Sequence, residues 1–190
     1  YAGKTLSELV EILGPSLMGH SLTEKYGSKF PLLIKIINAQ DKLSIQVHPS
    51  DEQAQRQGKG SVGKTEMWYM MPGTSPSASI LKGWKAPTSK EDVRAAIQNG
   101  TILSKLKEHA VASGDATLLE PGTVHTLKKG TIVAEIQENS DITYRLYDYD
   151  RTDQNGQKRQ LHLEDALDVL NYEADTMGVK HVECKANQVA

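Results

Sequence analysis

Short stretches in which apolar and polar residues alternate recur along this chain. In residues 43–48, Leu, Ile and Val occupy every second position, and Ser44, Gln46 and His48 lie between them. A period of two residues is typical of a β-strand whose two faces differ. The pattern predicts a strand that ends at Pro49, with one apolar face and one face that carries a hydroxyl, an amide and an imidazole.

Most of the chain has the same character. Gly and Pro turns separate the runs, as in the Pro-Gly and Lys-Lys-Gly turns within residues 116–137. Helical spacing of apolar residues appears instead at 3–14, in part of 51–57 and at 161–172, and a helical segment interrupts the strands at about 87–110. This order predicts an antiparallel β-sandwich or barrel with added helices. The remaining strands are expected at 31–41, where the strand should be buried, and at 64–73, 77–84, 116–137 and 141–151.

Composition adds limits to this picture. Charged residues make up 24% of the chain and its formal net charge is −2, which gives no electrostatic reason to expect nucleic acid or a membrane as a partner. No apolar run approaches the length of about 18–20 residues that a spanning helix needs. Cys184 is the only cysteine, so no internal disulfide can form. We expect a cytoplasmic protein without a signal peptide, and its oligomeric state stays open.

The polar strand face suggests metal chemistry. Gln46 and His48 lie roughly 6–7 Å apart along the strand, His125 follows a Pro-Gly turn, and Glu66 lies in another strand. Imidazoles with a carboxylate suit zinc, iron, nickel or manganese. Taken singly, each residue is more often an ordinary partnered or solvent-facing side chain. Because the chain has one thiol, a structural zinc site closed by cysteines is almost excluded.

Four motifs turn these separate candidates into one hypothesis. The segments LSIQVHPSDE, GKTEMWYM, PGTVHTL and EIQENSDITYRLYDYDR resemble the signature segments of type I mannose-6-phosphate isomerase (phosphomannose isomerase) in its shorter bacterial form. YAGKTLSEL and RQLHLEDALDV extend the resemblance to nearly the whole chain. It implies a cupin-type (jelly-roll) β-barrel that binds one Zn²⁺ per chain and interconverts mannose 6-phosphate and fructose 6-phosphate through a cis-enediol. The implied metal ligands are Gln46, His48, Glu66 and His125.

The resemblance also implies catalytic positions. Arg145 matches an active-site arginine that stabilises the enediolate or holds the substrate, Glu135 matches an active-site carboxylate that can carry a proton, and Lys64 can hold a sugar oxygen or a water. Without the family, Arg145 would be a surface partner of Asp148 or Asp141, and Glu135 a partner of Arg145. Which residue moves the proton stays open.

Three further positions are implied to bind the phosphorylated hexose. Ser44 can donate a hydrogen bond, Asp141 can shape the turn before Arg145, and Arg151 can reach the phosphate.

Family members extend beyond this chain at both ends. We therefore interpret residues 1–190 as a single cupin-type catalytic domain of a longer protein, with a second, C-terminal β-domain largely absent. Two other interpretations stay open. One is a non-catalytic cupin that binds metal or sugar, such as a regulatory relative. The other is an iron oxygenase, which the Gln46 ligand disfavours.

Overall fold

A computed structural model describes residues 1–152 and 154–183 of the chain. Cys184, on which the prediction about disulfides depends, lies outside the described residues. By its internal contacts the chain divides into two compact units, residues 1–33 and 34–190. Among the described residues, no helix is long and apolar enough to cross a membrane.

The first unit contains three short helices. Helix α1 (Leu6–Leu13) begins at a capping box in which Thr5 and Glu8 exchange hydrogen bonds between side chain and backbone, and it ends at Gly14, as its sequence predicts. Two further helices follow, α2 (Pro15–Met18) and α3 (His20–Tyr26).

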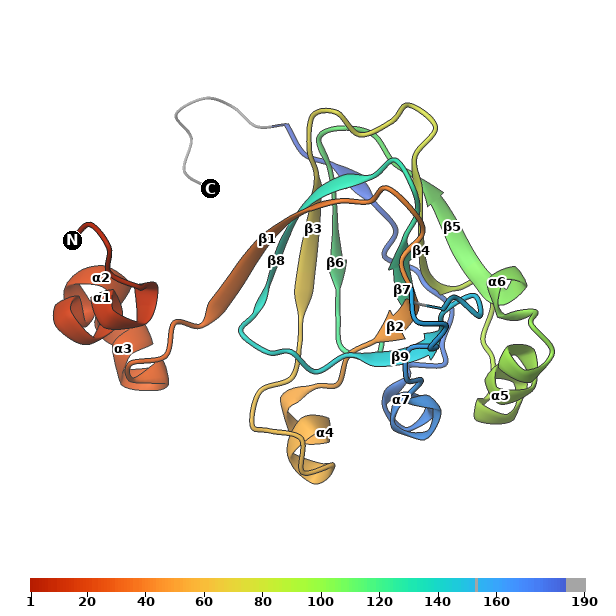
Figure 1. Ribbon diagram of the computed structural model, residues 1–190, viewed down its shortest axis with the longest axis horizontal. Helices are drawn as coiled ribbons and strands as arrows, with labels where there is room; N and C mark the ends of the chain where they lie inside the picture. The colour runs from red at the N-terminus through yellow and green to blue at the C-terminus, as the bar shows by residue number, and fades with distance from the viewer. Residues whose placement is uncertain (153, 184–190) are drawn as a thin grey trace. The chain divides into compact units, whose positions relative to one another are not determined.

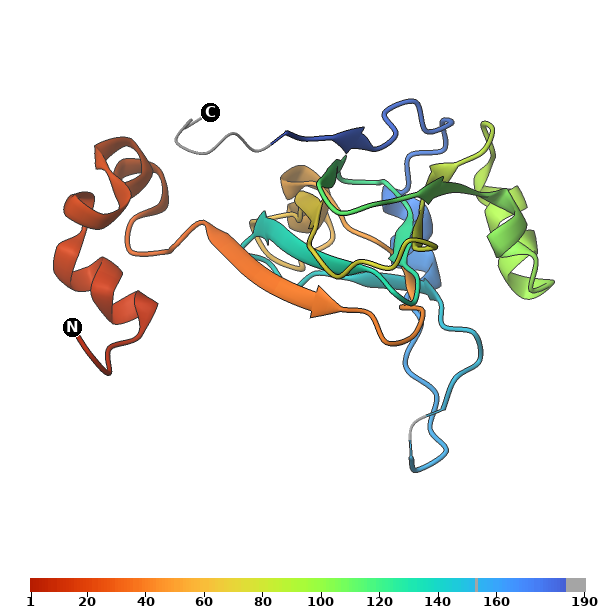
Figure 2. The same cartoon turned by 90° about the horizontal axis from the view of Figure 1, so that it is seen from above.

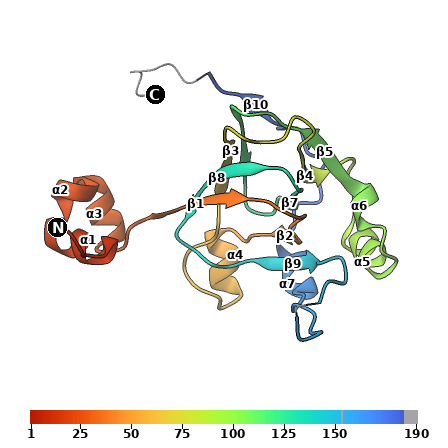
Figure 3. The same cartoon turned by 45° about the horizontal axis from the view of Figure 1, so that its top comes forward.

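The second unit is built on two five-stranded sheets (Figures 1 and 3). Antiparallel pairs join the strands from β8 to β10 in the first sheet and from β5 to β9 in the second. The mainly antiparallel β fold predicted from alternation is therefore confirmed. The first sheet has the order β1 (Leu32–Asn38), β8 (Ile132–Glu138), β3 (Glu66–Met70), β6 (Asp115–Leu119), β10 (Lys180–His181). The second has the order β5 (Leu106–Ala110), β4 (Ser79–Trp84), β7 (His125–Leu127), β2 (Ile45–Val47), β9 (Tyr144–Tyr147).

Two apolar clusters stabilise these layers. One joins the facing sides of the two sheets through residues such as Trp68, Ile80 and Leu127. The other joins β2, β4 and β9 to the helices, and it contains Ile45 and Val47, which are fully buried. The strand that carries Gln46 is therefore fixed by its apolar face, as its alternation predicts. The helices of this unit are α4 (Asp51–Arg56), α5 (Lys90–Gln98), α6 (Ile102–Lys105) and α7 (Leu163–Val169).

The structure corrects two details of the sequence-based picture. The strand at 31–41 is not buried, because β1 lies at a sheet edge and its residues Ile34 and Ile36 are 61% and 62% exposed. Residues 106–110 are not part of the helical segment but form β5, which pairs with β4. Apolar spacing continues through this region, and only the pairing partner distinguishes a last helical turn from a strand.

Candidate metal centre and active site

Three side chains from three strands or strand ends converge between the two sheets. His48 follows β2, Glu66 begins β3, and His125 begins β7, and all three are buried. One ligand atom of each lies within 4.8 Å of the others. His48 Nε2 is 3.4 Å from Glu66 Oε1, and His125 Nε2 is 3.5 Å from Glu66 Oε2. Atoms that share a tetrahedral ion at about 2.1 Å lie about 3.4 Å apart, so this spacing suits a divalent metal.

Both imidazoles are oriented from behind by backbone carbonyl groups. His48 Nδ1 donates to the Ile142 carbonyl and His125 Nδ1 donates to the Thr123 carbonyl, each at 2.8 Å. Because a carbonyl oxygen can only accept, Nδ1 carries the proton and the Nε2 lone pair faces the centre. Burial, helped by the Lys64 charge, lowers the pKa of His48 to about 3. Burial, helped by His48, also holds the pKa of His125 well below its usual value. Both rings are thus neutral, as metal ligation requires.

The surroundings of the Glu66 carboxylate indicate whether these residues can bind a cation. Both of its carboxylate oxygens are buried and accept no hydrogen bond from the described residues, although Lys64 Nζ contacts Oε1. An unsatisfied buried carboxylate is costly. Two neutral imidazoles and one carboxylate around a divalent ion would remove that cost, so the donor set fits a metal. His48, Glu66 and His125 therefore form a candidate metal triad.

Gln46 lies beside this triad on the same strand as His48. Its side-chain amide is 3.3 Å from His125 Nε2, and it is paired in register with both His125 and Arg145. Since the oxygen and nitrogen of an amide exchange places by a simple flip, the amide oxygen can take this position. The structure thus places the predicted fourth ligand next to the triad.

Lys64 points into the same centre. It is buried, its Nζ lies 3.2 Å from His48 Nε2, and it contacts Glu66. Burial lowers the pKa of Lys64 to about 8, against the opposing charge of Glu135. The alternation that places Lys64 and Glu66 on one strand face therefore leads to direct contact.

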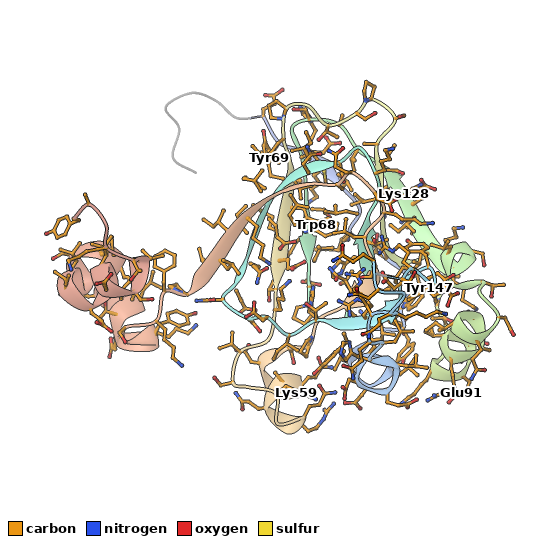
Figure 4. The ribbon with its side chains drawn as sticks, in the orientation of Figure 1. Lys59, Trp68, Tyr69, Glu91, Lys128 and Tyr147 are labelled. Atoms are coloured by element: carbon orange, nitrogen blue, oxygen red, sulfur yellow. The ribbon has the colours of Figure 1, made fainter. Side chains whose placement is uncertain are left out.

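Glu135 is held beside the centre by two donors. Trp68 Nε1 donates to its Oε2 and Lys35 Nζ donates to its Oε1, both at 3.0 Å. Trp68 is 1% exposed and extends from β3 into the space between the sheets (Figure 4). Its ring meets the His125 ring edge-on. Burial raises the pKa of Glu135, but the Lys35 hydrogen bond and the Lys64 charge outweigh it and lower the pKa overall. Glu135 is therefore a carboxylate partnered by Lys35, and not by Arg145.

Arg145 lies on the other side of Gln46. It extends from β9, its Nε donates to Ser44 Oγ at 3.3 Å, and its Nη1 donates to the Gln160 carbonyl at 2.9 Å. Ser44 is buried, so it anchors the guanidinium at the edge of the polar strand face. Asp148 accepts from Arg151 and Arg159, whereas Arg145 donates to Ser44 and to the Gln160 carbonyl, so Arg145 is not the hydrogen-bond partner of Asp148 among the described residues.

Arg151 belongs to a second group of charged side chains, which surrounds Asp148. Its Nη1 donates to the Lys42 carbonyl at 2.6 Å, and its guanidinium lies over the Tyr149 ring. It shares the carboxylate of Asp148 with Arg159. Residues 148–152 and 154–161, which include both arginines, belong to a loop that extends away from the sheets (Figure 2). Arg151 Nη1 also lies 3.6 Å from Asp41 Oδ2, so the two guanidinium groups face two carboxylates.

Asp141 lies apart from these groups. It lines an open cavity of about 510 Å³ together with Lys59, Ile142 and His162. This cavity lies behind the His48 ring, because the Ile142 carbonyl is the group that His48 donates to. No metal-triad residue lines it.

Comparisons with known proteins test the resemblance seen in the sequence. Residues 1–80 match the family model described as phosphomannose isomerase type I, catalytic domain. The chain is 43% identical over 170 residues to mannose-6-phosphate isomerase ManA of Bacillus subtilis, covering 90% of this chain and 52% of that protein. A mannose-6-phosphate isomerase of Streptococcus mutans is 44% identical over 143 residues, or 75% of this chain and 44% of that one.

The resemblance to type I phosphomannose isomerase is confirmed. The crystal structure of the Bacillus subtilis mannose 6-phosphate isomerase superposes with a TM-score of 0.80 at 38% identity, covering 90% of this chain and 52% of that one. An Archaeoglobus fulgidus protein described as a mannosephosphate isomerase has the same fold, with a TM-score of 0.72 at 23% identity. The chain spans about half the length of the phosphomannose isomerases it matches.

The site contains two residues that sequence reasoning missed. Lys35 lies within the apolar run of residues 31–37, and Trp68 lies in the predicted strand 64–73, where no pattern distinguishes it. A single charge among seven residues of an otherwise apolar strand was the available signal for Lys35. It lies on the inner face of β1, where it reaches Glu135 and contacts Gln137.

Proposed function

We propose that this chain supplies the metal centre of a zinc-dependent isomerase with a cupin-type fold, which interconverts mannose 6-phosphate and fructose 6-phosphate through a cis-enediol. The observation that carries the proposal is the triad of His48, Glu66 and His125, with both imidazoles anchored at Nδ1 and the buried Glu66 carboxylate facing both Nε2 atoms. The chain spans about half the length of the named isomerases, so the activity is proposed for the whole protein that contains this chain.

His48, Glu66, His125 and the amide of Gln46 would hold the ion. A divalent zinc ion held by these residues would supply positive charge that stabilises the oxygen atoms of the opened sugar. The donor set leaves the site with a net charge of about +1, since only Glu66 among its ligands is anionic. That charge matches the negative charge that develops on the sugar oxygens as the enediol forms.

Lys64 is the residue we assign to proton transfer between C1 and C2. It lies in the centre, 3.2 Å from His48 Nε2 and in contact with Glu66, and burial lowers its pKa toward the range in which an amine can accept and return a proton. Glu135 keeps its charge because Lys35 and Trp68 both donate to it, so we assign it to orienting Lys35 and balancing the cations. Lys35 is then the second amine at the site.

Arg145 and Arg151 are the candidates for the phosphate and the sugar oxygens. Arg145 is anchored by Ser44, and Arg151 by Asp148 and by the Lys42 carbonyl, so both guanidinium groups are pre-oriented. Planar guanidinium groups suit a phosphate because they donate two parallel hydrogen bonds. Asp141 lies in the neighbouring cavity, and we assign it to shaping the loop that carries Ile142.

The experiment follows isomerisation in the whole protein to which the activity is assigned. Zinc-loaded protein is given mannose 6-phosphate, and fructose 6-phosphate is measured before and after a chelator, then after zinc is restored. We expect activity that is lost with the metal and recovered with it. His125→Ala should lose both metal and activity, whereas His20→Ala, an exposed histidine on α3, should lose neither. Zinc binding without any isomerisation would contradict the proposal and favour the non-catalytic cupin.

A further inference from the structure

A second buried charged cluster lies in the second sheet, and the proposed reaction does not use it. Lys82 in β4 is 2% exposed, and its Nζ donates to Asp175 Oδ1 at 2.9 Å. Asp175 Oδ2 lies 3.2 Å from His109 Nε2, and Lys107 Nζ donates to the Asp175 carbonyl at 2.9 Å. A fully buried lysine is rare and needs a partner, because an isolated charge is costly in the interior. This pair therefore calls for an explanation.

Asp175 ends a segment that we call the strap, residues 171–175. The strap runs along Trp84. The Asp175 amide donates to the Trp84 carbonyl at 3.0 Å, and the indole Nε1 of Trp84 donates to the Asn171 carbonyl at 2.7 Å. At its other end, the Asn171 amide donates to the Gly122 carbonyl at 2.9 Å. The strap thus connects the charged pair to the turn at Pro121–Gly122.

This turn supports both histidines of the metal triad. The Gly122 amide donates to the His48 carbonyl at 2.9 Å, and the next carbonyl, that of Thr123, accepts from His125 Nδ1. Strap and turn are in close contact, since a Cβ at Gly122 would lie 2.9 Å from the Val169 carbonyl oxygen and 3.0 Å from the Asn171 nitrogen. A displacement of the strap would therefore also displace the Gly122 amide and the Thr123 carbonyl, which contact the two histidines.

The charge of Lys82 gives the pair a second effect on the site. Lys82 is paired in register with His125, so the two side chains start from the same face of the sheet. With Asp175 in place, the ammonium faces a carboxylate, which Lys107 and His109 also approach. Without it, an unbalanced positive charge would remain on the face that carries a metal ligand, and it would repel a cation.

We propose that Asp175 is a positioning residue for the metal centre. Its pairing with Lys82 holds the strap against the Pro121–Gly122 turn, fixes the Thr123 carbonyl that orients His125, and offsets the Lys82 charge behind this ligand. The inference rests on the proposed metal centre. Groups that orient a metal ligand typically change affinity by about 10- to 100-fold when they are altered.

The test measures Co²⁺ binding by its visible absorption band, at one pH, in the full chain. Asp175→Asn should weaken Co²⁺ binding by about tenfold or more and shift the band. The double variant Lys82→Met, Asp175→Leu removes both charges and keeps a packed contact, so it should fold. It loses the ion pair that holds the strap but leaves no unbalanced charge, so it should bind more weakly than wild type and more tightly than Asp175→Asn, with a shifted band. Glu108→Gln, at the exposed pair with Lys128 on the same sheet, is the matched control and should bind as wild type.

The outcomes separate this inference from the proposed function. Wild-type affinity and an unshifted band in both Asp175 variants would overturn it. If Asp175→Asn does not fold, the double variant alone decides. A wild-type chain that binds no Co²⁺ would overturn the metal centre and this inference together. If the wild-type chain binds Co²⁺ but the whole protein that contains it does not isomerise the sugar, the proposed function alone is refuted, and the affinity comparison still tests Asp175.

Discussion

Gly63 lies where two of the four motifs meet, and its replacement by alanine is a direct test of the packing of the site. Its amide donates to Asp51 Oδ1 at 2.6 Å, and the next amide, that of Lys64, donates to the Pro49 carbonyl at 3.0 Å. The residue that carries Lys64 and the segment that follows His48 are thus joined backbone to backbone. Only a residue without a side chain permits this approach.

The magnitude follows from the contacts that a Cβ would make. At Gly63 it would lie 2.4 Å from the Ser50 carbonyl carbon, 2.5 Å from the Pro49 oxygen and 2.6 Å from the Asp51 nitrogen. Ordinary contacts begin near 3.4 Å, so one backbone must move by about 1 Å. Overpacking of this kind costs about 1–3 kcal/mol and sometimes more. A displacement of about 1 Å in a catalytic group costs on the order of 100-fold in rate.

Urea unfolding of Gly63→Ala and Gly58→Ala measures the effect. Gly58 has a φ of +66° but nothing within 4 Å of its Cβ position, so its replacement should cost only the conformational strain of about 1 kcal/mol. We expect Gly63→Ala to lose about 2–4 kcal/mol and to bind metal more weakly. A free energy of unfolding for Gly63→Ala equal to or above that of Gly58→Ala would refute the reasoning.

Three further outcomes are expected. Arg145→Ala should keep the metal and lose about 100-fold or more in kcat, while the exposed Arg94→Ala should keep both; steady-state kinetics with metal analysis checks this. Trp68→Phe should lose about 1–2 kcal/mol in urea unfolding, because Glu135 loses a charged hydrogen bond. Burial raises the pKa of Asp148, but Arg159 and Arg151 outweigh it and lower the pKa. The carboxylate thus stabilises the fold above its unfolded pKa near 3.8. Asp148→Asn should lose about 2 kcal/mol at pH 7, and the difference from wild type should shrink as the pH falls below about 4.

The strand that carries Gln46 and His48 was predictable because alternation reports which residues share a face. Ile45 and Val47 are buried in the cluster beneath the helices, and Gln46 points to the other side, as their spacing requires. The convergence of Glu66 and His125 was not contained in any local pattern. The prediction that they converge came from the family motifs. Contacts between residues far apart in sequence depend on the whole fold, so no local pattern could reveal them.

Other features were beyond sequence reasoning for physical reasons. Lys35 acquires its role from a partner 100 positions away, and an apolar strand does not reveal which of its faces is covered. Asp175 and Lys82 are 93 positions apart, and each alone resembles an ordinary surface charge. Their burial becomes visible only when the strap is placed against β4.

The most direct test of the account is the metal content of the chain and of one triad variant. Purified wild-type protein, incubated with Zn²⁺ and dialysed, should retain one zinc ion per chain by elemental analysis, and Glu66→Gln should retain far less while remaining folded. Glu66 is the only anionic member of the triad, so this substitution removes the charge that holds the cation. Equal zinc retention by the two proteins would contradict the central claim.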